Sequence, residues 1–350
     1  MVKLVGCAAF VYDDSVLKYD FGSGHPFKIT RVRMARDRLA GSFRELQIEP
    51  ARSAARAEAE LFHDPGYLDL VKSLSTTGAG LLDGGDTPAF QGCYEASLSV
   101  VGATLNAVEL VLSGKYAHAA SFAGGLHHAS RGNASGFCIM NDCAVALALL
   151  RKRFNKVAYV DLDAHHGDGV MYGFYSDPGV ICVDVHQDGR TLFPGTGSYL
   201  EAGSGEAKGT KLNLPLPPGS ADDVLLATFG DLAVPFLEEA RPDFFIVQCG
   251  ADGLKGDPLA GLSFTQCGYL RIIEMLHEIA HRACWGRLVL VGGGGYKPEA
   301  VAECWAGEHM VLSGKPPLCE TKTSTSLPSV LRKAESVISA IRESHPSFSG

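Results

Sequence analysis

The sequence has few of the features that mark secreted, nucleic-acid-binding or membrane proteins. Its 350 residues include no Cys-x-x-Cys pair, no block of Lys and Arg, and no apolar run that approaches a membrane span. The start of the chain lacks the apolar segment and cleavage site of a secretory signal. We therefore expect the ten cysteines to be reduced thiols. These absences predict a cytoplasmic protein that binds neither nucleic acid nor a membrane.

The sequence also has no internal repeat and no linker with the composition of a domain boundary. Hydrophobic residues make up 46% of it, which suffices for one large α/β domain. We predict a single domain that spans residues 1–350. The net charge of −8 would tolerate a cationic substrate and weakly attract it. Nothing in the composition argues against oligomers.

Apolar runs of strand length alternate with patterns typical of helices. The predicted strands cover residues 2–11, 117–123, 157–160, 180–185, 243–249 and 287–291. The predicted helices cover residues 30–40, 58–63, 65–73, 94–112, 141–153, 220–240, 265–283, 298–310 and 328–343. This alternation predicts the α/β class, with a parallel sheet covered by helices on both faces. The Gly-rich residues 75–92 are expected to form an exposed loop.

Five ionisable side chains directly follow the apolar run at residues 157–160, namely Asp161, Asp163, His165, His166 and Asp168. Burying such groups is costly unless they pair with one another or hold a metal. In an extended chain, alternate residues point to the same side, which brings Asp161, Asp163 and His165 together. Carboxylates with an imidazole are typical ligands of Zn²⁺ or a related cation. The alternative interpretation is an acidic loop that caps a helix.

Polar groups also follow three other predicted strands. These are the pair His127-His128, Asp252 and Tyr296. In open parallel sheets, ligands bind at the carboxyl ends of the strands. A zinc site built on Asp163 and His165 needs a third ligand, for which Asp252 is the best-placed carboxylate. Three protein ligands leave a fourth position open for water, as a catalytic zinc ion requires.

The two adjacent histidines suggest acid–base chemistry. A histidine that transfers protons commonly has its second ring nitrogen held by a carboxylate. Asp161 and Asp168 are not needed for the metal, so two histidine–carboxylate dyads are possible. Together with activated water and the Tyr296 phenol, these groups form a hydrolytic set. The base would take a proton from water, zinc and the phenol would stabilise the oxyanion, and a protonated histidine would serve the leaving amine.

These motifs resemble those of the histone deacetylase superfamily, which includes bacterial acetoin-utilisation-type and acetylpolyamine deacetylases. The resemblance runs in order over roughly residues 5–315 and is greatest to the class I branch. It rests on residues 25–34, 124–128, 134–138 with Asn141, 161–170, 193–197, 250–252 and 292–296. The resemblance implies a single-domain, arginase-like α/β fold.

The resemblance also implies roles for individual residues. The catalytic set would be Zn²⁺ on Asp163, His165 and Asp252, a general base His128 backed by Asp168, a protonated electrostatic aid His127 backed by Asp161, and Tyr296 polarising the scissile carbonyl. The substrate set would be Phe137 and Phe193 as walls of an apolar tunnel, Gly136 at its floor, Asp86 as a clamp near the rim, and Arg31 at an acetate exit. A structural K⁺ would use Asp161, Asp163, His165, Asp184 and the backbone at Val185. A second K⁺ site would use Phe174, Asp177 and Val180, with its outermost partner near Thr210.

The expected activity is zinc-dependent removal of acetyl groups from primary amines, most simply acetyl-lysine side chains in proteins. Small acetylated polyamines such as acetylputrescine, acetylcadaverine and acetylspermidine are the alternative substrates. Polyamine-selective members of the family carry Glu at the tunnel rim, where this sequence has Leu259. A leucine at the rim favours a substrate with an uncharged aliphatic arm, such as acetyl-lysine. The native metal can be Zn²⁺ or Fe²⁺.

Two competing functions are less well supported. A zinc protease is suggested by His277-Glu278-Ile279-Ala280-His281, with Glu299 or Glu303 as a third ligand. However, the apolar stripe of this predicted helix lies opposite Glu278 and His281, so we expect the motif to face solvent. A catalytically idle module that reads acetylated ligands is disfavoured because the zinc ligands and Tyr296 are all present. Nucleotide binding at the glycine-rich residues 292–295 is also disfavoured, because they lack the Lys-Ser/Thr of a phosphate-binding loop.

Overall fold

The computed structural model describes residues 8–316 and 322–348. Within these residues, eight strands form one parallel sheet in the order β2-β1-β3-β8-β7-β4-β5-β6. The strands are β1 (Ala8–Val11), β2 (Gln47–Glu49), β3 (His118–Ser121), β4 (Val157–Asp161), β5 (Val180–Gln187), β6 (Lys211–Leu216), β7 (Phe245–Gln248) and β8 (Leu288–Val291). The α/β fold class predicted from the sequence is confirmed.

The order of the strands explains where the functional residues meet. The chain runs outward from β4 through β5 to β6, and then returns through β7 and β8 to lie between β4 and β3. The four central neighbours β3, β8, β7 and β4 are therefore the strands followed by His127-His128, Tyr296, Asp252 and Asp161–Asp168. Because all strands are parallel, these segments emerge at the same edge of the sheet.

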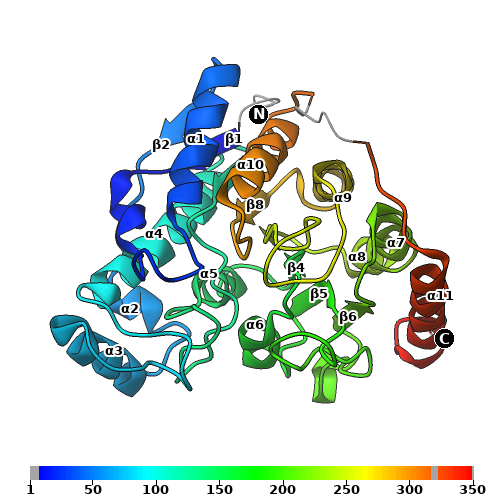
Figure 1. Cartoon of the computed structure of the whole chain (residues 1–350), viewed down its shortest axis with the longest axis horizontal. Helices are drawn as coiled ribbons and strands as arrows, with labels where there is room; N and C mark the ends of the chain where they lie inside the picture. The colour runs from blue at the N-terminus through cyan, green and yellow to red at the C-terminus, as the bar shows by residue number, and fades with distance from the viewer. Residues whose placement is uncertain (1–7, 317–321, 349–350) are drawn as a thin grey trace.

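Helices surround the sheet (Figure 1). They are α1 (Thr30–Ser42), α2 (Arg56–Ala59), α3 (Pro65–Thr77), α4 (Cys93–Leu112), α5 (Asp142–Arg151), α6 (Asp168–Gly173), α7 (Asp222–Thr228), α8 (Val234–Ala240), α9 (Gln266–Cys284), α10 (Pro298–Leu312) and α11 (Pro328–Ser344). Helices α1 and α9 pack on α10, while α4 packs on α5 and against β1 and β3. Every residue of β3, β4, β5, β7 and β8 is buried, as expected for parallel strands covered on both faces.

The structure differs from the predicted elements at the two edge strands of the sheet and in the helices. Strands β2 and β6 were not predicted: β2 has only three residues, two of them exposed, and the apolar pattern of β6 is interrupted by Lys211 and Pro215. Proline is tolerated at such an edge. The helix predicted over residues 220–240 is divided by a π-helical turn, Phe229–Ala233. Helix α6 was also not predicted, because only six residues form it.

Helix α4 is long and apolar enough to span a membrane by length and composition, contrary to the sequence-based expectation that no segment would be. However, 72% of its most apolar window is buried within the protein, so it is a core helix. Seven described cysteines are free and buried, in agreement with the expected thiols. Cys267, by contrast, is disulfide-bonded, and the expectation is wrong there.

Candidate active site

Three potential metal ligands converge where β4 and β7 end. His165 Nδ1 lies 3.1 Å from Asp163 Oδ1 and 2.9 Å from Asp252 Oδ2. All three residues are buried, and their ligand atoms lie within 4.8 Å of one another. The sequence-based interpretation as an acidic capping loop does not describe this geometry, because the side chains face one another. The structure therefore brings together the three residues that the sequence predicted as zinc ligands.

Two backbone amides and the side-chain amide of Gln248 hold the carboxylates in place. Gly294 N and Gln248 Nε2 donate to Asp163 Oδ2 at 2.6 and 2.8 Å, and Ala164 N donates to Asp252 Oδ1 at 2.7 Å. A Cβ at Gly294 would lie 2.0 Å from Asp252 Oδ2, so the close approach of this backbone requires glycine. Sequence reasoning did not identify Gln248; its position at the end of β7 was the available signal.

The charges in this triad suit a divalent cation. Burial and the neighbouring Asp163 raise the pKa of Asp252 to about 7. Burial also opposes ionisation of Asp163, but the nearby His127 and His165 lower its pKa well below the usual value. Two buried carboxylates and an imidazole thus share one small volume. A cation held between them would offset the repulsion between the carboxylates, so these residues fit the expected metal.

The two histidines form separate dyads. His127 Nδ1 lies 2.7 Å from Asp161 Oδ2, and His128 Nδ1 lies 2.7 Å from Asp168 Oδ1. Asp161 Oδ2 also accepts a hydrogen bond from the Tyr159 hydroxyl at 2.6 Å. The His127 ring lies close to the metal triad, since its Nε2 is 3.9 Å from Asp163 Oδ2. These pairs are the ones that the family resemblance implied.

The dyads shift the two imidazoles in opposite directions. Burial alone would lower the pKa of His127, but the carboxylates of Asp161 and Asp163 outweigh it and raise this pKa to about 10. Burial and the neighbouring His127 lower the pKa of His128 to about 4, although Asp168 opposes the shift. At neutral pH, the site therefore contains one imidazolium and one neutral imidazole that can accept a proton.

Aromatic rings surround the approach to these groups. The Phe137 ring stands edge-on to Tyr296 with centroids 6.0 Å apart, and Phe193 stands edge-on to His128 at 5.1 Å. Phe193 is 44% exposed and so lies at the mouth. A Cβ at Gly136 would lie 2.5 Å from His128 Cδ2. His127, His128 and Tyr296 line a cavity whose free volume is about 20 Å³, enough for one water molecule.

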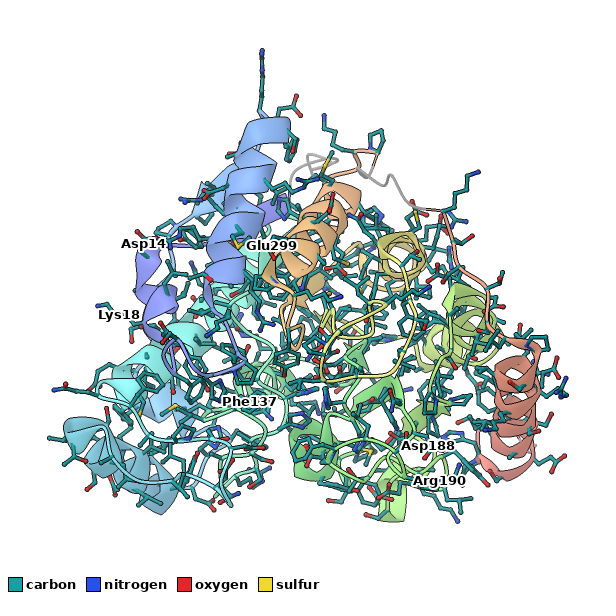
Figure 2. All side chains as sticks on the ribbon, in the orientation of Figure 1. Asp14, Lys18, Phe137, Asp188, Arg190 and Glu299 are labelled. Atoms are coloured by element: carbon teal, nitrogen blue, oxygen red, sulfur yellow. The ribbon has the colours of Figure 1, made fainter. Side chains whose placement is uncertain are left out.

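Phe137 is held in an unusual backbone conformation, with φ = 68°. Its carbonyl accepts a hydrogen bond from the Tyr19 hydroxyl at 2.7 Å, and its amide donates to Thr87 Oγ1 at 3.0 Å. Thr87 in turn donates to Asp86 Oδ1 at 3.1 Å. The loop that carries Asp86 is thus connected directly to one wall of the cavity. Figure 2 shows Phe137 near the middle of the molecule, between the N-terminal elements and α6.

Asp257 connects Leu259 to Tyr296. Its two oxygens accept hydrogen bonds from the amides of Leu259 and Tyr296, at 2.9 and 2.7 Å. Leu259 itself is 37% exposed, which agrees with a position at the rim. Asp257 was not among the residues identified from the sequence, because no motif surrounds it.

Arg31 is buried beneath the Tyr296 segment. Its guanidinium donates to the carbonyls of Gly293 and Gly295 and lies over the rings of Phe27 and Trp305. Burial lowers the pKa of Arg31. The contacts show that Arg31 orients the backbone next to Tyr296; its expected role at an acetate exit stays a prediction.

The residues predicted for the first K⁺ also lie together. Asp161, the last residue of β4, is paired in register with Asp184 in the middle of β5, and both are buried. Asp184 accepts a hydrogen bond from Gly167 N at 2.9 Å and lies 2.6 Å from His186 Nδ1. Burial opposes its ionisation, yet His186 and His166 lower its pKa. Val185 follows Asp184 within β5.

The expected second K⁺ position differs from the prediction. The Lys211 ammonium donates to the carbonyls of Asp177 and Val180, at 3.1 and 2.5 Å, and to Thr210 Oγ1 at 2.9 Å. Lys211 is fully buried. A side-chain cation therefore takes the place between the backbone oxygens that were expected to bind K⁺.

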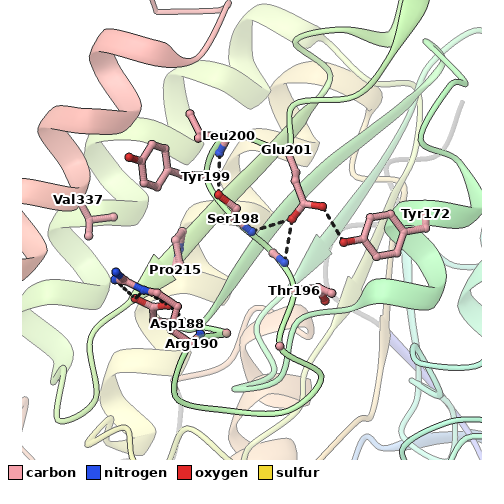
Figure 3. Close-up of a pocket in the computed structure, with 13 residues that line it drawn as sticks. Tyr172, Asp188, Arg190, Thr196, Ser198, Tyr199, Leu200, Glu201, Pro215 and Val337 are labelled. Atoms are coloured by element: carbon pink, nitrogen blue, oxygen red, sulfur yellow. Dashed lines mark hydrogen bonds and ion pairs between the residues drawn. The ribbon is translucent and has the colours of Figure 1, made fainter.

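A larger depression of about 350 Å³ lies beside the loop that carries Phe193 (Figure 3). None of the predicted catalytic or metal-binding residues lines it. Its Glu201 accepts hydrogen bonds from the amides of Gly197 and Ser198 and from the Tyr172 hydroxyl. Glu201 thereby stabilises the loop behind Phe193, but the depression is separate from the candidate catalytic groups.

The protease interpretation does not fit the structure. The Glu278 side chain is 71% exposed and its carboxylate lies 3.7 Å from the Arg282 guanidinium. Glu303, which was considered as a third ligand, pairs with Arg38. The third potential metal ligand next to His277 and His281 is not a glutamate but His118.

The fold and the site together define a class of enzyme. A buried Asp–His–Asp triad beside two His–Asp dyads, at the carboxyl edge of a parallel α/β sheet, is the arrangement of a metal-dependent amidohydrolase. The sequence pattern described as "Histone deacetylase domain" matches residues 25–312. The chain belongs to the histone deacetylase family and is a deacetylase.

Known proteins that resemble the chain agree with this assignment. Acetoin utilization protein AcuC of Bacillus subtilis is 40% identical over 324 residues, which cover 89% of this chain and 83% of AcuC. Human histone deacetylase 1 is 34% identical over 313 residues, covering 86% of this chain and 64% of that protein. The crystal structure of the HDA15 HD domain superposes with a TM-score of 0.84 and 26% identity, covering 98% and 97% of the two chains.

Proposed function

We propose that this protein hydrolyses the N-acetyl amides of primary amines, most simply acetyl-lysine side chains in proteins, in a single deacetylase domain. Zn²⁺ would be held by Asp163, His165 and Asp252. The observation that carries the proposal is the buried Asp–His–Asp triad beside two separate His–Asp dyads. One imidazolium and one neutral imidazole are the two protonation states that amide hydrolysis needs at neutral pH.

The metal would supply Lewis-acid chemistry, polarising the acetyl carbonyl and lowering the pKa of water. His128 accepts a proton from the attacking water at Nε2, while Asp168 holds the Nδ1 proton and fixes the ring. His127 stays protonated against Asp161 and stabilises negative charge in the transition state. The Tyr296 hydroxyl donates to the oxyanion. His128 then returns the proton to the leaving amine.

The predicted ligands can be tested without measuring activity. Asp252→Ala removes one carboxylate of the triad, so we expect the variant to lose its active-site zinc on dialysis. Elemental analysis of the dialysed full-length chain measures this loss. Asp188→Ala, a carboxylate change outside the triad, is the control and should retain zinc. Full retention of zinc at the triad by Asp252→Ala would contradict the ligand assignment.

A structural K⁺ beside the metal is part of the proposal. Asp161 and Asp184 are two buried carboxylates in register on neighbouring strands. The ion would also contact Asp163, His165 and the backbone at Val185. A monovalent cation there would offset the repulsion between the two carboxylates, which supports this assignment.

The proposed substrate has a long neutral arm. Phe137 and Phe193 would enclose the arm. Leu259 at the rim is uncharged, so it would not attract a positively charged arm. The net charge of −8 argues in the other direction, because it attracts polyamines. Acetylated polyamines are therefore the alternative substrates.

The deciding experiment compares kcat/KM for an acetyl-lysine peptide and for acetylputrescine, in the wild type and in Leu259→Glu. We expect the wild type to prefer the peptide. A rim carboxylate should shift the ratio toward acetylputrescine by about tenfold, the effect of roughly 1.4 kcal/mol. Leu200→Glu, which adds the same charge at an exposed leucine beside the depression in Figure 3, should leave the ratio unchanged. A wild-type preference for acetylputrescine would refute the substrate assignment.

A further inference from the structure

Three histidines converge at a second place in the molecule. His118 Nε2 lies 3.1 Å from both His277 Nε2 and His281 Nε2, and the last two atoms are 3.2 Å apart. His277 and His281 are separated by four residues on α9, so they lie on the same face of that helix. His118 is the first residue of β3. A strand and a helix thus direct three ring nitrogens toward one point.

The spacing of these nitrogens matches tetrahedral metal coordination. Zinc–nitrogen bonds are about 2.0–2.1 Å long, which places two ligand nitrogens of a tetrahedron about 3.3 Å apart. The three observed separations are within about 0.2 Å of this value. Imidazole is a good ligand for Zn²⁺ and for the neighbouring divalent transition metals.

The protonation states also favour a cation. Burial and the two neighbouring imidazoles lower the pKa of His118 to about 3. Burial and His281 lower the pKa of His277 to about 4, against a small opposing effect of Glu278, and burial lowers that of His281. Neutral imidazoles carry a lone pair that can bind a metal. When the ring protons are on Nδ1, three lone pairs face one another, and a shared cation would relieve their repulsion.

The turn after α9 closes over the cluster. Gly286 has φ = 84°, and a Cβ there would lie 2.8 Å from His281 Cε1 and 3.0 Å from His118 Cε1. The absence of a side chain at Gly286 is therefore required for two of the imidazoles to keep their positions. His118 is buried, His277 is half-buried and His281 is exposed. An ion could reach the cluster from the side of His281.

We propose that His118, His277 and His281 bind a divalent transition-metal ion, with Zn²⁺ as the best match to the three imidazoles. The ion would connect the start of β3 to the last turns of α9. The candidate active site lies at the carboxyl ends of the parallel strands, whereas His118 is at the amino end of β3. The histidine cluster is therefore a separate site on the opposite side of the sheet. The Glu278 side chain is largely exposed and lies beside Arg282, so it is not held as the general base of a zinc protease, and the ion would stabilise the fold.

The test is equilibrium dialysis of the full-length chain against micromolar Zn²⁺, followed by elemental analysis. The wild type should bind two zinc ions, His281→Ala one, and Glu278→Ala two, since that control alters the same helix without removing a ligand. Asp252→Ala should bind one ion and the double variant Asp252→Ala/His281→Ala none. Equal binding by wild type and His281→Ala would overturn the second site. Failure of Asp252→Ala to lose an ion would instead affect only the active-site assignment.

A thermal measurement distinguishes a built site from weak binding to surface histidines. In Asp252→Ala, which keeps only the histidine cluster, saturating Zn²⁺ should raise Tm by several degrees because the ion binds the folded chain. His277→Ala in the same background should abolish the increase, and Glu278→Ala should preserve it. Circular dichroism without zinc checks that each variant folds. An equal increase in all three proteins would show adventitious binding and would refute the proposal.

Discussion

His127 and His128 face each other through their Nε2 atoms, 3.0 Å apart, while their Nδ1 atoms contact different carboxylates. One imidazolium stabilises a neutral neighbour, because a second positive charge at this distance would be repelled. Burial and this contact lower the pKa of His128, while the Asp161 and Asp163 carboxylates raise that of His127, so adjacent residues in the sequence carry different protonation states.

This relationship predicts that His128 is the group whose loss removes the proton acceptor. We expect His128→Ala to lower kcat by roughly 10²–10⁴-fold, the usual contribution of general acid–base catalysis. Single-turnover kinetics with an acetyl-lysine peptide measure the change. His63→Ala, at another buried histidine distant in sequence, tests whether loss of any buried imidazole has the same effect. Wild-type kcat in His128→Ala would assign the proton transfer to another residue.

A second prediction concerns the Tyr296 hydroxyl. The Tyr296→Phe substitution keeps the ring packed against Phe137 and removes only the donor. We expect kcat to fall by roughly 10²-fold or more, with little change in KM, because the hydrogen bond forms in the transition state. Tyr175→Phe removes the hydroxyl of a half-buried tyrosine in the turn after α6, outside the lining of the catalytic cavity, and is the matched control. Unchanged turnover would exclude Tyr296 from oxyanion stabilisation.

The central part of the fold and the metal triad could be predicted because the signals are local. Each of the four central strands is a short apolar run followed within a few residues by ionisable or phenolic groups. The parallel arrangement then forces these groups to one edge. The edge strands could not be predicted in the same way, because the Lys211 and Pro215 side chains interrupt β6 and β2 is largely exposed.

Contacts between distant segments were not predictable from the sequence. His118 is an isolated histidine at the start of a small-residue strand, and its partner His277 lies 159 positions away. Asp257 and Gln248 act through hydrogen bonds to backbone and carboxylate groups that only the fold brings near. The apolar stripe of α9 correctly placed His281 at the surface, but it gave no indication that another element approached it.

Asp86 provides a prediction about pH. Burial and the nearby Asp83 carboxylate raise the pKa of Asp86 to about 6. We propose that Asp86 accepts hydrogen bonds from the substrate backbone, as the family resemblance implies; the ionised carboxylate is the stronger acceptor, so protonation would weaken this contact. We therefore expect KM for an acetyl-lysine peptide to rise as the pH falls through about 6. Asp83→Asn removes the like charge and should move the change to lower pH.

Asp86→Asn is the decisive variant for this prediction. It cannot ionise, so its KM at pH 8 should equal the raised wild-type value at low pH and should vary little between these conditions. Initial-rate measurements across this range provide KM at each pH. A wild-type KM profile in Asp86→Asn would show that the carboxylate does not contact substrate.

Lys211 provides a prediction about stability and K⁺. The Lys211→Met substitution retains most of the side-chain volume but removes the ammonium donor from both carbonyls; the Asp177 carbonyl keeps the Val180 amide at 3.3 Å, whereas the Val180 carbonyl loses its 2.5 Å hydrogen bond. We expect the free energy of unfolding to fall by about 1–3 kcal/mol, the cost of buried unsatisfied groups. K⁺ should restore part of the loss, since carbonyl oxygens also bind this ion.

Urea titrations with and without K⁺ measure the effect of Lys211→Met. Lys208→Met, an exposed lysine three residues earlier, should change neither the stability nor its dependence on K⁺. Equal unfolding midpoints for wild type and Lys211→Met in buffer without K⁺ would mean that the buried ammonium is dispensable.

Glu308 on α10 predicts that stability declines as pH rises. The carboxyl is fully buried, and its Oε2 has no hydrogen-bond partner among residues 8–316 and 322–348. Burial raises the pKa of Glu308 to about 8, whereas an unfolded Glu titrates near about 4.3. Between these values the folded chain keeps a proton that the unfolded chain has released. Its contribution to stability is therefore complete below about pH 4.3 and is lost progressively up to about pH 8.

Glu308→Gln cannot ionise, so it removes this source of pH dependence. We expect its stability relative to the wild type to increase by at least about 1 kcal/mol between pH 5 and pH 8, since one pKa unit corresponds to about 1.4 kcal/mol. Comparing the two pH values cancels any constant effect of the buried amide. Glu303→Gln, which alters a partly exposed carboxylate on the same helix, should not change the slope. Urea unfolding at both pH values measures the difference, and parallel curves for wild type and Glu308→Gln would show that Glu308 is ionised in the folded protein.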